Sequence, residues 1–105
     1  MSLNNFCMWA RKIEEKAVSG NIVTKLSILP ENIETDNRSA YLDVDTDKYI
    51  GRIIFWESSF CDLEILNIES GENIYYKHIE NCTNNFDLEF EEFFRILKIE
   101  SVLTD

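Results

Sequence analysis

A chain of 105 residues has the length of one domain, and residues 1–105 are expected to share a single core. Its content of 45% hydrophobic and 12% aromatic residues excludes an intrinsically disordered chain. The formal net charge of −10 argues against non-specific binding to nucleic acid or to an anionic membrane, because both require a basic surface. The charge favours a basic partner, or it serves only to keep the protein soluble.

The N-terminal third predicts a helix followed by a strand. Over residues 3–19 the apolar side chains repeat at the three- and four-residue spacing of one buried helical stripe, and Gly20 follows where glycine favours a helix stop. Residues 21–29 alternate between two faces and predict an edge strand that ends at Pro30. The polar residues 31–37 predict a surface loop.

Four more strands are predicted between Ser39 and His78. Their polar links, residues 45–48, 57–59 and 69–72, are too short for parallel crossovers and therefore join antiparallel neighbours. Alternation makes one face of these strands apolar, and it gives the other face acids and aromatic rings. The candidate partner-binding residues lie on that second, acidic-aromatic face: Tyr41, Asp43, Asp45, Arg52, Trp56, Asp62 and Glu64. Gly51 within a strand predicts a bulge or the close approach of a helix.

A second helix is predicted from Phe86, with Asn85 as its cap, to Lys98 or frayed towards Leu103. Its phenylalanines repeat at helical spacing and are expected to lock the helix onto the apolar face of the sheet. The predicted fold is therefore α+β: an antiparallel five-stranded meander sheet with an N-terminal and a C-terminal helix packed on one face. The acidic-aromatic face stays open to water or to a partner.

The cysteines and the apolar runs bear on the compartment. Three widely spaced cysteines, Cys7, Cys61 and Cys82, fit neither a disulfide framework nor a zinc site, and at least Cys7 and Cys61 are expected to be reduced core residues. No apolar run is long enough to span a membrane, and the N-terminus lacks the features of a secretory signal. We therefore expect a cytoplasmic protein.

No residue pattern indicates catalysis, a metal or a cofactor. The single histidine, His78, lies near Cys82 but in no known nucleophile motif. Asp43, Asp45 and Asp47 begin like a calcium loop but lack the turn glycine and the bidentate acid that follow in such loops. Asp62 and Glu64 could act as paired carboxylates, but they are expected on an open face without a cleft. We expect no enzymatic activity.

Three segments resemble the TriTu family of bacterial immunity proteins, which are small acidic proteins associated with polymorphic toxin systems. They are SAYLDVDT (residues 39–46), IGRIIFWES (residues 50–58) and CDLEIL (residues 61–66). The resemblance covers residues 39–76 and, more loosely, the flanking helices. It implies neutralisation of a toxin by direct binding and no catalysis, and it does not identify the toxin.

Three hypotheses follow. In the first, the chain is an immunity protein: its acids pair with Lys or Arg of a basic cognate toxin, Trp56 fills a pocket, and Arg52 fixes the orientation. In the second, it is a structural or adaptor domain that assembles through its sheet, which leaves a homo-oligomer open. In the third, it is a small enzyme that uses His78, Cys82 or the carboxylates, which would require a deep pocket holding two of those groups.

Overall fold

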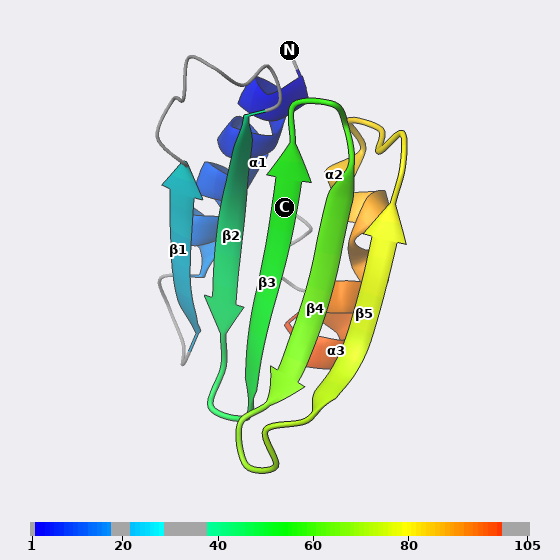
Figure 1. The fold of residues 1–105 in the computed structure, drawn as a ribbon. Helices are drawn as coiled ribbons and strands as arrows, with labels where there is room; N and C mark the ends of the chain where they lie inside the picture. Colours follow the sequence, from blue (N-terminus) through cyan, green and yellow to red (C-terminus); the bar gives the residue numbers. More distant parts are fainter. Residues whose placement is uncertain (1, 18–21, 29–37, 100–105) are drawn as a thin grey trace.

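The structure is a computed structural model that describes residues 2–17, 22–28 and 38–99. The elements follow one another along the chain as α1 (Ser2–Lys16), β1 (Val23–Ile28), β2 (Ser39–Asp45), β3 (Tyr49–Trp56), β4 (Cys61–Asn67), β5 (Asn73–Ile79), α2 (Phe86–Glu89) and α3 (Glu91–Leu97) (Figure 1). This is the predicted α+β arrangement of a sheet between N-terminal and C-terminal helices.

The five strands form one sheet in the order β1-β2-β3-β4-β5, and each pairs antiparallel with its neighbours. The predicted meander is confirmed, with β1 at an edge. Leu42 lies opposite Leu26 on β1 and Ile53 on β3, and Ile53 lies opposite Leu63 on β4. One face of the sheet is therefore a continuous apolar layer, as the alternation predicts.

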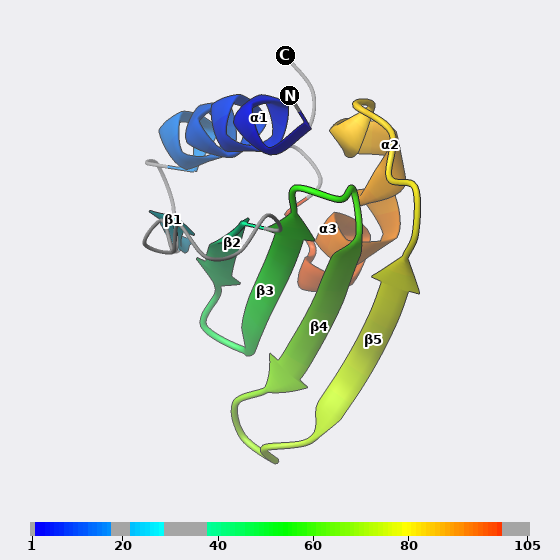
Figure 2. The same cartoon turned by 45° about the horizontal axis from the view of Figure 1, so that its top comes forward.

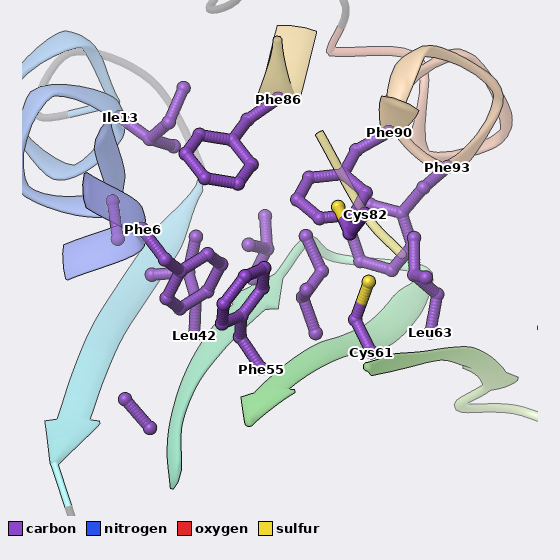
Figure 3. Packing of buried hydrophobic residues seen from close by; sticks show 14 of the residues in the cluster. Phe6, Ile13, Leu42, Phe55, Cys61, Leu63, Cys82, Phe86, Phe90 and Phe93 are labelled. Atoms are coloured by element: carbon purple, nitrogen blue, oxygen red, sulfur yellow. The ribbon is translucent and has the colours of Figure 1, made fainter. Parts of the chain in front are cut away.

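All helices lie on that apolar face. α1 lies over β1, β2 and β3, whereas α3 contacts β4, so the two ends of the chain cover different halves of the sheet (Figure 2). Aromatic rings fill the space between the layers, and Phe55 of β3 contacts rings from both ends of the chain (Figure 3). The Phe6 ring of α1 stacks on Phe55 with centroids 4.9 Å apart, and Phe86 of α2 meets it edge-on at 5.7 Å. Such ring pairs stabilise by about 0.5–1.5 kcal/mol beyond their burial.

The prediction of one continuous C-terminal helix is wrong, because the helix is broken at Phe90. This residue ends α2 and begins α3 with φ −109° and ψ 15°, and its ring is fully buried. The break lets Phe86 face α1 while Phe93 turns towards the sheet, as Figure 3 shows. The Asn85 cap is confirmed, since its side chain accepts a hydrogen bond from the Leu88 amide at 3.4 Å.

Some boundaries differ from the predicted ones. α1 ends at Lys16, although the Ala17 amide still donates to the Ile13 carbonyl at 3.0 Å, and β1 begins at Val23. α3 ends at Leu97, in agreement with the predicted end near Lys98, and Lys98 adopts a left-handed conformation with φ 63°. Predictions for the stop at Gly20, for Pro30, for residues 31–37 and for residues 100–105 lie outside the described residues.

Gly51 marks the close approach of a helix, one of the two predicted readings. A Cβ at this position would lie 2.8 Å from Cζ of Phe93 and 3.2 Å from Cδ1 of Leu97, both on α3. It would also lie 3.1 Å from the Val44 carbonyl oxygen on β2. The absence of a side chain therefore lets α3 settle onto the middle of the sheet.

The three cysteines are buried free thiols. Burial raises the pKa of the Cys7 thiol despite the nearby charge of Arg11. A hydrogen bond between the thiols of Cys61 and Cys82, together with burial, raises the pKa of Cys61 strongly. Both groups are therefore poor nucleophiles in the folded protein, as expected of core residues.

Replacing Gly51 with alanine should lower the free energy of unfolding by about 1–3 kcal/mol, the usual effect of overpacking a core. Urea denaturation measures the change. In a Phe93→Leu background the same substitution should be less destabilising, because the nearest atom to the new methyl group is then removed. An equal loss in both backgrounds would contradict the contact with α3.

Cys7 and Cys61 should react with iodoacetamide at pH 8 at least about tenfold more slowly in the native protein than in urea, because little thiolate forms and the reagent has no access. Mass spectrometry of digested, time-quenched samples gives the rate for each cysteine. Labelling of either residue at the rate of a free thiol in the native protein would show that the packing around it is wrong.

Candidate functional site

The second face of the sheet is bare, because no described helix lies over it (Figure 1). The register places the seven candidate residues together on this face. Asp43 lies opposite Arg52, and Arg52 lies opposite Glu64. Tyr41 and Asp62 lie on either side of Ile54. The alternation therefore predicted correctly that these side chains share a surface, whereas their part in binding stays a prediction.

Arg52 forms the rigid centre of the acidic-aromatic face. Its Nε donates to Oδ1 of Asp43 at 2.6 Å and its Nη2 to Oδ2 at 3.3 Å, and the guanidinium carbon lies 4.2 Å from the centroid of the Tyr41 ring. The hydrogen bond to Asp43 is the main reason why the pKa of Arg52 is raised. The charge of Asp43 is thus already compensated within the protein, which makes Asp43 a weaker candidate for pairing with a partner.

Asp45 carries a charge that its surroundings disfavour. The residue is half-buried, and its Oδ1 accepts no hydrogen bond from the described part of the chain. Burial, and then the charge of Asp43, raise the pKa of Asp45, while Arg52 and a hydrogen bond from the Gly51 amide act in the opposite direction. The register also places Asp45 between two exposed apolar residues, Val23 and Ile50.

On β4 and β5, Asp62 lies at the centre of a cluster that sequence reasoning missed. Its Oδ1 accepts a hydrogen bond from the Tyr76 hydroxyl at 3.0 Å and contacts Nδ1 of His78 at 2.5 Å. The hydrogen bond from the Tyr76 hydroxyl to Asp62 is the main cause of the raised pKa of Tyr76. The ring of Phe60 meets the His78 ring edge-on, with centroids 5.7 Å apart.

Phe60, Tyr76 and His78 were absent from the predicted site, although the sequence carries a signal for Tyr76 and His78. Pairing β4 with β5 puts His78 opposite Asp62 and Tyr76 opposite Glu64, so extending the alternation by one strand would have found both. Trp56 lies opposite Ser39, at the same end of the strands as Phe60, and it is half-buried and thus less exposed than expected.

The enzyme hypothesis depends on how the described residues place acids, histidine and cysteines around a pocket. Among the described residues, no group of three or more His, Cys, Asp or Glu side chains is placed to hold a metal ion. A hollow of about 660 Å³ lies at the β2–β3 and β4–β5 hairpins, and residues such as Asp47, Lys48 and Glu72 line it without a histidine or a cysteine. None of the described helices is both long and apolar enough to cross a membrane.

A small α+β domain with one sealed face and one bare, charged face has the build of a binding module. The family model "Immunity protein TriTu" matches residues 4–96, and the chain therefore belongs to the TriTu family of immunity proteins. The match extends from α1 into α3 and confirms the resemblance found in the strands. A comparison with curated proteins finds no match. Family membership supports an immunity function.

Replacing Asp45 with asparagine should stabilise the protein at pH 7 by roughly 0.2–1 kcal/mol, the scale of a partly exposed charge. Because the pKa of Asp45 is higher in the folded state than the ordinary value of 3.8, ionisation disfavours folding. The gain should therefore shrink as the pH falls through the raised pKa and vanish below the ordinary value.

Urea denaturation between pH 7 and pH 3 measures this gain, with Asp47→Asn as the control, since Asp47 is an exposed acid two residues away. A stabilisation by Asp45→Asn that is the same at every pH would contradict a charge effect at this position.

Proposed function

We propose that this protein neutralises a cognate bacterial toxin by direct contact, with the bare face of the sheet as the contact surface and without catalysis. The observation that carries the proposal is that the helices seal only one face, while the seven candidate side chains share the other. Family membership supports a toxin as the partner. The shared placement of acids and rings supports this surface as the place where the toxin docks.

The electrostatics favour a basic toxin. The chain carries a formal charge of −10, and such a field accelerates the encounter with a positively charged protein. A toxin that acts on nucleic acid would be one such protein, because its own site has to attract phosphate. The Arg52–Asp43–Tyr41 unit is already ordered in the free protein, so it would lose little conformational freedom on binding.

The adaptor hypothesis makes a different prediction about assembly. β1 and β5 are the edges of the sheet, and an edge strand can pair with another chain. Light scattering over a range of concentrations separates the two hypotheses. A monomer leaves the bare face available to a toxin, whereas a stable homodimer that buries Trp56 would overturn the proposed surface.

Glu64→Lys should weaken binding to the toxin encoded beside this gene by at least about tenfold, because it reverses a charge in the middle of the face. The matched control is Glu15→Lys, the same charge change at an exposed position of α1, on the other side of the molecule. Surface plasmon resonance gives the rate constants, and survival of cells that express the toxin gives protection.

We expect the control to bind within about twofold of the wild type. An equal loss in both variants would mean that only the total charge matters. Wild-type binding and protection by Glu64→Lys would show that the toxin docks elsewhere. An association rate that does not fall with added salt would contradict a basic partner.

A further inference from the structure

We infer that Phe60, Asp62, Glu64 and Tyr76 form a receptor for a single arginine side chain of the partner protein. This inference rests on the proposed function and specifies its chemistry. The four residues come from β4, from the residue before it and from β5. They lie on the bare face, beside the Arg52–Asp43 pair.

The Asp62 carboxylate is oriented before any partner arrives. Tyr76 and His78 both engage Oδ1, and no described residue donates a hydrogen bond to Oδ2. The side chain keeps 24% of its surface exposed. The contacts of Oδ1 thus hold the Asp62 carboxylate in place, while Oδ2 can accept a hydrogen bond from a partner. Because the carboxylate is already oriented, less entropy is lost when a cation binds.

Glu64 supplies a second acceptor on the same side of β4. It makes no hydrogen bond or ion pair with the described residues, because its neighbour Arg52 directs its guanidinium to Asp43. The register places Glu64 directly between Arg52 and Tyr76. Two carboxylates two residues apart on one face can meet the several N–H donors of a guanidinium.

Two exposed rings flank these acids. Tyr76 is 59% and Phe60 is 39% exposed, a large apolar surface for rings that lie beside charged groups. A hydrated Lys ammonium gains little from such rings, whereas a planar, weakly hydrated guanidinium can stack on them and donate to carboxylates at once. The combination therefore favours arginine over lysine.

A neighbouring part of the same face shows how an acid and a tyrosine can bind an arginine side chain. On β2, an acid and a tyrosine hold the guanidinium of Arg52: Asp43 binds it through two hydrogen bonds, and the Tyr41 ring lies 4.2 Å from it. On β4 and β5, Glu64 and Asp62 also lie near a tyrosine, although Tyr76 comes from the neighbouring strand, and no hydrogen bond or ion pair joins an arginine of the described residues to either acid. The binding of Arg52 by Asp43 and Tyr41 thus supports arginine as the cation that Asp62, Glu64 and Tyr76 would bind.

The test is an NMR titration of the ¹⁵N-labelled protein with N-acetyl-arginine amide, with the lysine and citrulline equivalents as comparison probes. We expect saturable shifts at the amides of residues 60–64 and 76, tighter binding of the arginine probe than of the lysine probe by about two- to fivefold, and no saturation with the neutral citrulline probe. Equal binding of the arginine and lysine probes, or shifts centred elsewhere, would overturn the inference.

Glu64→Gln and Tyr76→Leu should each remove most of the arginine response, while Glu15→Gln on α1 should leave it unchanged. Both substituted side chains are at least partly exposed, and thermal denaturation checks that the variants fold. An unchanged response in Glu64→Gln would also overturn the receptor. Because these probes need no toxin, a missing arginine response with intact toxin binding would disprove the receptor alone, and a normal response without toxin binding would disprove the proposed function.

Discussion

The structure depends on the packing of aromatic rings between the helices and one face of the sheet. Phe55 receives Phe6 from one end of the chain and Phe86 from the other, so residues that are far apart in sequence close over the same strand. The Trp9 indole of α1 also donates a hydrogen bond to Asp87 of α2 at 2.8 Å. The described helices are thereby held on one side of the sheet, and the opposite side carries no described helix.

The fold was largely predictable because its signals are local. Period-two alternation fixes which side of a strand is apolar, and short polar links allow only antiparallel neighbours. The break at Phe90 was not predictable, because its residue pattern suits an unbroken helix. The break separates Phe86, which contacts Phe6 of α1, from the α3 residues that pack on the sheet, and such long-range packing is not contained in the local residue pattern.

The candidate site was predictable only in outline. Alternation put Asp43, Arg52 and Glu64 on one face, but it did not reveal which acids already have partners. Both carboxylate oxygens of Asp43 accept from Arg52, and only Oδ1 of Asp62 is engaged by Tyr76 and His78, whereas Glu64 makes no hydrogen bond or ion pair with the described residues. This distinction depends on cross-strand geometry, and it leaves the acceptors without a complete set of partners on β4, next to β5.

The bare face also has a consequence for how copies of this protein meet one another. An uncovered layer with exposed rings such as Tyr76 would ordinarily tend to stack on a second copy. Here, stacking would bring the Asp62 and Glu64 carboxylates of one molecule against those of the next, and like charges repel. Face-to-face contact between two copies would therefore have to overcome this repulsion, whereas the same carboxylates would attract a cationic protein.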